Sequence, residues 1–99
     1  MRSLEKIIKD AVSVNKCRFG SREVLNSTKG SKLIVLTESV SEDIKLRIIE
    51  QARATEIPIL DYKGNSIQLG KLCNKPFRVS AIALKMGDEE DIRNILVGN

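Results

Sequence analysis

The sequence predicts an α/β protein, a three-layer αβα sandwich in which helices cover both faces of a small four-stranded mixed sheet. Segments with apolar residues at helical spacing alternate with short apolar runs, and such alternation is typical of a sheet packed between helices. A chain of 99 residues can bury one hydrophobic core but is too short for a second. No repeat or long linker interrupts the pattern, so we expect a single domain over residues 1–99.

The first half of the chain is expected to form two helices and two strands. Apolar residues at helical spacing predict a helix over the first dozen or so residues, and a short strand can follow at 17–19. Gly20-Ser21 then offers a turn and an N-cap for a helix that we expect to continue to Lys29, with Gly30 as its C-terminal stop. The continuous apolar run 33–36 predicts a central strand that is covered on both faces.

The second half continues the alternation. A helix is expected from Ser41 to about Thr55, because acids follow its start and apolar residues recur on one face. Pro58 cannot donate a ladder hydrogen bond, so the strand at 57–60 should place it at the strand start or at a sheet edge. The remaining expected elements are a helix capped by Asn65 or Ser66 that ends near Leu72, a strand over 79–84 and a helix that begins near Gly87.

The residue content argues against an enzyme and against a metal or cofactor site. The chain has no His, and Cys17 and Cys73 are far apart without a CxxC motif, so neither a zinc-ligand spacing nor a His-activated thiol can be built. We expect two buried, reduced thiols instead. No glycine-rich phosphate loop follows a strand, and no apolar stretch suits a membrane span or a signal peptide. A cytoplasmic, non-enzymatic protein that contacts no membrane is therefore expected.

Positive charge is concentrated in two parts of the chain that contain almost no acids. The net charge is +4, but residues 14–33 hold five basic residues against Glu23 alone, and residues 62–86 hold five basic residues and no acid. The rest of the chain is net acidic. Such a distribution favours a polyanionic partner, because displaced phosphate counterions favour binding. The alternative is a pair of solvated faces.

The first candidate segment for contact with such a partner is the expected helix start at Gly20, Ser21, Arg22 and Glu23. An exposed helix start presents main-chain N–H groups to phosphate, and Arg22 adds positive charge. Glu23 can accept hydrogen bonds from the edge of an unpaired or sheared guanine. Taken alone, an ordinary first-turn acid is the simpler interpretation of Glu23.

The second candidate is the exit of the central strand, where Glu38 and Ser39 could lie near the first segment. A helix-capping loop is the simpler interpretation of this stretch. In an αβα sandwich the corners between strands and helices commonly share one rim, so we expect the candidate segments to lie together.

The third candidate is the loop before the strand at 79–84. Phe77 and Val79 can pack against an extruded base, while Lys75 and Arg78 meet phosphate. The alternative is that Phe77 is buried at the start of the strand.

Several motifs, in order along nearly the whole chain, resemble a known family. They are Gly20-Ser21-Arg22-Glu23-Val24, Ser31-Lys32-Leu33-Ile34-Val35, Ile57-Pro58-Ile59, Gln68-Leu69-Gly70 and Lys75-Pro76-Phe77-Arg78-Val79-Ser80-Ala81. Together they resemble the archaeal and eukaryotic L-thirty-e ribosomal proteins of the L-seven-Ae superfamily. The resemblance implies an αβα sandwich of about this length that recognises sharply bent, kink-turn RNA without catalysis.

The resemblance also implies residue roles. Residues 20–23 resemble the family segment that sits on the tandem sheared G·A pairs of the kink, and residues 75–79 resemble the loop that covers the flipped-out base. The strand exit departs from the L-thirty-e pattern, because many members have Asn where Ser39 stands. This segment, like Glu23, is more similar to L-seven-Ae.

On this resemblance we expect a structural constituent of the large ribosomal subunit, at the ribosome in the cytoplasm. Its expected partners are kink-turn ribosomal RNA and other ribosomal proteins, and the free protein is expected to be a monomer. The lysines expected at phosphates are Lys16, Lys29, Lys32 and Lys75. The alternatives are an L-seven-Ae-like kink-turn module of other ribonucleoproteins and a protein-interaction scaffold without RNA recognition.

Overall fold

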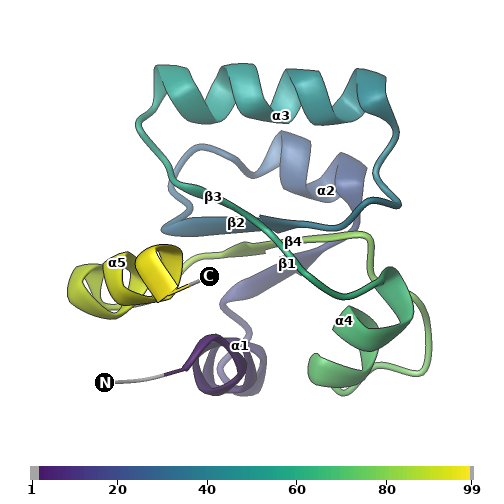
Figure 1. The fold of residues 1–99 in the computed structure, drawn as a ribbon, viewed down its shortest axis with the longest axis vertical. Helices are drawn as coiled ribbons and strands as arrows, with labels where there is room; N and C mark the ends of the chain where they lie inside the picture. The colour runs from purple at the N-terminus through teal and green to yellow at the C-terminus, as the bar shows by residue number, and fades with distance from the viewer. Residues whose placement is uncertain (1–2, 99) are drawn as a thin grey trace.

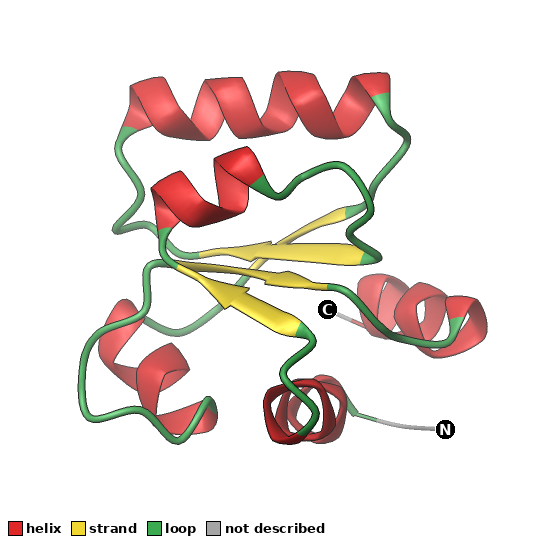
Figure 2. Cartoon of the chain, turned by 180° about the vertical axis from the view of Figure 1, so that it is seen from behind, coloured by secondary structure: helices red, strands yellow, loops and turns green. Residues whose placement is uncertain are grey.

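The computed structural model describes residues 3–98 and shows a four-stranded sheet between two layers of helices (Figure 1). The elements, in chain order, are α1 (Leu4–Ser13), β1 (Cys17–Phe19), α2 (Ser21–Asn26), β2 (Leu33–Leu36), α3 (Glu42–Ala54), β3 (Ile59–Asp61), α4 (Ser66–Leu72), β4 (Ala81–Leu84) and α5 (Glu89–Gly98). Helices α2 and α3 cover one face of the sheet, and α1, α4 and α5 cover the other (Figures 1 and 2). The predicted fold class and element order are confirmed. Within the described residues, no helix is both long and apolar enough to cross a membrane.

The sheet has the strand order β1-β4-β2-β3, so β2 lies inside it as predicted. Strand β2 is parallel to β3 and antiparallel to β4, and β4 is antiparallel to β1. Strands β1, β2 and β3 therefore point the same way, and β4 points back. As a result, the C-terminal ends of three strands and the start of β4 lie at one edge of the sheet.

Strand β2 separates two apolar cores. Leu33 and Val35 pack against the layer of α1, α4 and α5, whereas Ile34 and Leu36 pack against α2 and α3. This division follows because successive side chains of a strand point to opposite faces. All four residues are almost completely inaccessible to solvent, which confirms the prediction of a strand covered on both faces.

Side-chain caps define three helix starts. Ser3 accepts from the N–H of Lys6, and Ser41 accepts from the first turn of α3, as its predicted helix start requires. At α4, Asn65 and Gln68 form a capping box in which each side-chain oxygen accepts from the other residue's N–H at 2.9 Å. Asn65 rather than Ser66 is therefore the cap, an interaction that contributes about 1 kcal/mol in typical helices.

The predicted C-terminal end of the second helix is wrong. Helix α2 ends at Asn26 and not at Lys29. The hydroxyl of Thr28 donates to the carbonyl oxygen of Val24 at 3.0 Å, which is the acceptor that a continued helix would offer to the main-chain N–H of Thr28. Gly30 does take a left-handed φ of 88°, but it turns the chain toward β2 instead of stopping the helix.

Three other predicted boundaries need correction. Gly20, with a φ of 94°, is the N-cap of α2 without a side-chain hydrogen bond, and Ser21 is the first helical residue. Strand β4 begins at Ala81 and not at residue 79. Strand β3 is an edge strand that starts just after Pro58, in agreement with the missing N–H of proline, but it extends one residue beyond the predicted 57–60.

Cys17 and Cys73 are free and buried, as predicted. Burial raises the pKa of the Cys17 thiol from 9.0 to about 12 and that of the Cys73 thiol to about 11. Because the thiolate is the nucleophile, both thiols should react slowly with iodoacetamide in the folded protein at mildly alkaline pH and rapidly in guanidinium chloride. Mass spectrometry of the labelled protein checks this, and rapid labelling of either folded thiol would contradict it.

The same pKa shifts have a consequence for stability. The unfolded thiols lose their protons at lower pH than the folded ones, so folding is favoured fully below pH 9.0 and less as the pH rises through 11 to 12. The free energy of unfolding should therefore fall over this range, which urea titrations at increasing pH would measure.

Candidate nucleic-acid interface

Three loops meet at the edge of the sheet where β4 begins (Figure 2). We call residues 20–23, 37–40 and 75–80 the loop edge. The N–H of Gly20 donates to the carbonyl of Ala81 at 2.9 Å, and the N–H of Thr37 donates to the carbonyl of Ser80 at 3.0 Å. The prediction that the three candidate segments share one rim is therefore confirmed.

The first segment is a tight corner between β1 and α2. A Cβ on Gly20 would meet no atom within 4 Å, so its φ of 94°, and not lack of space, calls for glycine there. Val24 is completely buried and holds α2 against the sheet, which leaves Arg22 and Glu23 exposed. Ser21 is half-buried. The corner therefore presents one cation and one carboxylate to solvent.

An arginine of the edge strand lies beside that carboxylate. The Nε of Arg18 is 3.9 Å from Oε1 of Glu23, and both side chains are about half exposed. Such a solvated pair adds about 1 kcal/mol of stability at most. Its main effect is to bring a second positive charge beside Glu23. The two arginines outnumber the single carboxylate, so the corner with Arg18 carries a net positive charge.

The second segment is held by a threonine. Thr37 is 3% exposed, and its hydroxyl donates to the carbonyl of Ser80 at 2.7 Å and accepts from the N–H of Ser39 at 3.2 Å. Glu38 and Ser39 are exposed. The cap of α3 is Ser41, which lies beyond this turn. The loop therefore both leads into a capped helix and presents two polar side chains at the loop edge.

The third segment exposes Phe77 and buries Val79. Phe77 is 56% exposed, so the alternative that it starts a buried strand is wrong. Val79 is 1% exposed and belongs to the same apolar core as Leu69, so the prediction that its side chain packs against a base is not compatible with its position. Hydrogen bonds from the N–H of Lys75 to Gly70 and from the N–H of Val79 to Ser66 tie the loop to α4.

A cleft of about 260 Å³ lies beside Phe77. Ile67 of α4 contributes its apolar wall and is 43% exposed. The other lining residues are Lys71, Lys75, Pro76, Phe77 and Arg78. The ammonium of Lys75 also lies 4.8 Å from the ring centroid of Phe19, which links this loop to β1. The cleft thus combines an apolar surface with three cations and no acid.

Lys29 and Lys32, predicted as RNA contacts, lie at the opposite end of the sheet. Lys32 precedes β2, and its N–H donates to the carbonyl of Leu84 at 2.6 Å, where β4 ends. Both lysines are exposed. Strand β2 of four residues, about 13 Å long, separates them from the loop edge. The structure therefore does not bring them together with residues 20–23 and 75–79.

Two residues of this interface were missed by the sequence analysis. Arg18 lies between Cys17 and Phe19 in a strand, so the alternation of buried residues could have placed its side chain on the face toward α2. Ile67 is out of phase with the buried Leu69 of the same helix, and that phase could have marked it as exposed.

Residues 2–94 of the chain match the family described as "Ribosomal protein L7Ae/L30e/S12e/Gadd45 family". The chain belongs to this family. Within the L7Ae/L30e group it is 32% identical over 92 residues to large ribosomal subunit protein eL30 of Methanosarcina mazei, which covers 91% of this chain and 85% of that protein. It is 33% identical over 84 residues to eL30 of Methanothermobacter thermautotrophicus, which covers 83% and 86%. The predicted resemblance to the archaeal L-thirty-e proteins is confirmed.

Solved structures share the fold of this L7Ae/L30e family member. The 15.5kD RNA binding protein of Giardia lamblia has a TM-score of 0.74 at 17% identity, over 96% of this chain and 82% of that one. A Bacillus halodurans protein of unknown function has a TM-score of 0.75 at 18% identity, over 94% of each chain. At these identities the likeness concerns the fold.

Proposed function

We propose that this chain is a structural constituent of the large ribosomal subunit that binds and stabilises kink-turn ribosomal RNA. Its relatives are large ribosomal subunit proteins, and the family match spans residues 2–94. The observation that carries the RNA contact is the loop edge, where exposed Arg22 and Glu23 accompany exposed Phe77 and Arg78. The partners are ribosomal RNA and neighbouring ribosomal proteins at the cytoplasmic ribosome. The free protein is a monomer, and its role is not enzymatic.

The corner at residues 20–23 recognises the kink in the RNA through direct contact with a base. The Glu23 carboxylate accepts from the amino and imino groups of a guanine in a sheared pair, a contact that specifies the base. Arg18 lies within reach of the same carboxylate, and Arg22 precedes it. Their charges attract the phosphates that flank the guanine, so affinity from this corner depends on salt.

The loop at residues 75–78 holds a base that leaves the stack. Phe77 offers an exposed ring, and Ile67 supplies the apolar wall that Val79 does not. Stacking of one base on an aromatic side chain contributes about 1–3 kcal/mol. Lys71 and Arg78 lie beside the same cleft and meet the adjoining phosphates. Val79 supports the loop from the core.

The corner at residues 20–23 and the loop at residues 75–78 must contact the RNA at the same time. This requirement selects the bent form of the RNA. The hydrogen bonds of Gly20 and Thr37 to the start of β4 hold the loops in a preformed arrangement. A preformed surface that fits the kinked RNA shifts the RNA population toward the kink. Straight duplex RNA would retain only the phosphate contacts, so it should bind more weakly and with less dependence on Glu23.

A Glu23→Gln protein should lose selectivity for kinked RNA. The amide keeps the shape of the carboxylate but replaces one acceptor by a donor, so the contact with guanine weakens by about 1–3 kcal/mol. Dissociation constants for a kink-turn RNA with tandem G·A pairs and for a straight duplex of the same length measure the effect. The matched control is Glu50→Gln on α3, which removes an exposed carboxylate away from the loop edge. Unchanged selectivity of Glu23→Gln would remove this residue from the recognition surface.

A further inference from the structure

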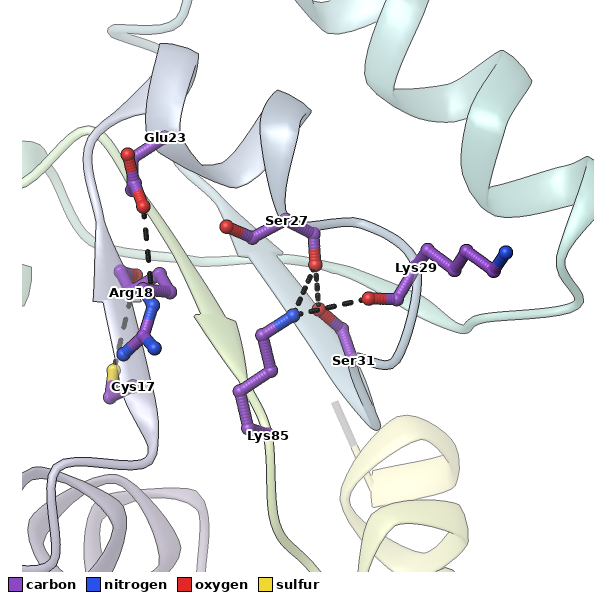
Figure 3. Close-up of polar contacts among 7 residues, drawn as sticks. All are labelled: Cys17, Arg18, Glu23, Ser27, Lys29, Ser31 and Lys85. Carbon is purple, nitrogen blue, oxygen red and sulfur yellow. Dashed lines mark hydrogen bonds and ion pairs between the residues drawn. The ribbon is translucent and has the colours of Figure 1, made fainter.

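Lys85 joins the end of β4 to the turn that follows α2 (Figure 3). Its ammonium donates to the carbonyl oxygen of Ser27 and, at 3.2 Å, to that of Lys29. These partners are 58 and 56 positions away in the sequence, so only the folded chain creates the contact. Its main-chain N–H also donates to the carbonyl of Lys16 at 2.8 Å, which fixes the position of Lys85 beside β1.

Hydroxyl groups and Lys85 together donate to the carbonyl groups at this end of α2. The last carbonyls of a helix lack partners within the helix and carry its partial negative charge, so a cation there is favourable. Ser27 is the C-cap of α2, and its carbonyl also accepts from the hydroxyl of Ser31 at 2.7 Å. One oxygen at the end of α2 is therefore held by an ammonium and by a hydroxyl.

Several contacts set the orientation of α2, and Lys85 is one of them. The others include the hydrogen bond from Gly20 to Ala81 at the helix start, the completely buried Val24 in its middle and the packing of the helix against α3. Six residues of helix extend about 9 Å, so a shift at one end of α2 moves the other end as well. Glu23 lies in the first turn, and recognition groups need placement within about 0.5 Å.

The charge of Lys85 interacts with the charges of Arg18 and Glu23. Burial lowers the pKa of Lys85, the charge of Arg18 lowers it further, and the carboxylate of Glu23 opposes both effects. Figure 3 shows Arg18 on β1 with its dashed contact to Glu23 on one side of α2, and Lys85 under the turn at its end. The Lys85 ammonium and the Glu23 carboxylate therefore belong to one group of charges on the same face of the sheet.

From these contacts we infer that Lys85 is a positioning residue for RNA recognition: it holds the C-terminal turn of α2 so that Glu23 is aimed at the kinked RNA. The inference rests on the proposed function of the loop edge. Lys85 lies at the opposite end of α2 from Glu23, so its effect passes through the helix. Lys85 itself does not contact the bound base.

The test compares Lys85→Met with Lys85→Arg in the full chain. Lys85→Met removes both hydrogen bonds to the turn, and we expect about a tenfold loss of affinity for kinked RNA and little loss for a straight duplex. Lys85→Arg retains a cation with several donors and should stay within about twofold of the wild type. The matched control is Lys6→Met on the exposed side of α1, which also removes one positive charge.

Two readouts separate positioning from other roles. If Lys85 contacted phosphate itself, Lys85→Met would reduce the slope of log K against log salt by about 0.7–0.9, whereas positioning leaves the slope unchanged. In the Glu23→Gln background, Lys85→Met should cause less than about a twofold further loss, because both changes remove the same contact. A reduced slope, or full additivity of the two changes, would overturn the inference.

The effect of each substitution on stability is measured in a separate experiment. Thermal unfolding of each variant sets an assay temperature at which it is folded, and a Lys85→Met protein that melts earlier but keeps its RNA selectivity would show a merely structural role and overturn the inference. If Lys85→Met does not fold, Ser31→Ala is tested in its place. It removes the hydrogen bond from the Ser31 hydroxyl to the same Ser27 carbonyl without a change of charge. We then expect about a threefold loss of selectivity, and unchanged selectivity would count against the inference. A wild-type protein with no preference for kinked RNA would instead refute the proposed function, and with it the inference.

Discussion

A Gly70→Ala protein is expected to be less stable and to lose its preference for kinked RNA. A Cβ on Gly70 would overlap the main-chain carbonyl oxygen of Phe77 and lie 3.5 Å from the nitrogen of Val79. Main-chain atoms cannot move aside as a flexible side chain does, so the loop at 75–78 has to shift. Alanine normally stabilises a helix by about 1 kcal/mol relative to glycine, but overpacking costs about 1–3 kcal/mol, so we expect a net loss.

The RNA effect of Gly70→Ala follows from the displaced ring of Phe77. A base stacked on an aromatic side chain contributes about 1–3 kcal/mol, so affinity for kinked RNA should fall by about tenfold or more. Urea titration and RNA binding below the unfolding transition measure the two effects. The matched control for the RNA effect is Gly64→Ala, where the three atoms nearest the added Cβ belong to the side chains of Gln68 and Tyr62, so the change can disturb the capping box of α4 but not the main chain of the Phe77 loop. Equal losses of RNA affinity from the two substitutions would contradict the role assigned to Gly70.

Ile34→Ala is expected to reduce the free energy of unfolding by about 2–5 kcal/mol. Ile34 is fully buried in β2, between Ala83 of β4 and Ile59 of β3, and it belongs to the core that packs against α2 and α3. The substitution removes apolar contacts and leaves a cavity that the surrounding residues fill only in part. Since small domains are stable by about 5–15 kcal/mol, this is a large fraction of the total.

The control for Ile34→Ala is Leu46→Ala. Leu46 is 57% exposed on α3, so its truncation should change the free energy of unfolding by less than about 0.5 kcal/mol. Urea titrations with an unchanged m-value would show that both variants unfold in the same transition. An Ile34→Ala protein as stable as Leu46→Ala would mean that the centre of the sheet is not the main apolar core.

Much of the fold was predictable because it depends on local patterns. Helical spacing marks the buried face of α3 through Ile48, and the unbroken apolar run of β2 requires cover on both sides. The shared edge of the three candidate loops was also predictable, because strand ends gather in an αβα sandwich. The boundary errors occurred where a side chain competes with the main chain, as Thr28 does at the end of α2.

The candidate site was predictable only in part. The sequence identified the Phe77 loop, but it left open whether Phe77 is exposed and wrongly gave the adjacent apolar wall to Val79. Val79 is buried in the core that also holds Leu69, and the wall comes from Ile67 on a different element. Neither arrangement follows from the order of residues in the loop, because both depend on how α4 lies against β4.

By itself, the sequence determined the order of helices and strands, the central place of β2 and the gathering of three polar loops, because spacing of apolar residues and turn chemistry act over a few positions. Only the tertiary structure decided which side chains complete the surface. It separated Lys32 from the loop edge, placed Arg18 beside Glu23 and bound Lys85 to a turn 58 positions away. Such contacts join residues distant in the chain, so they exist only once the sheet has paired.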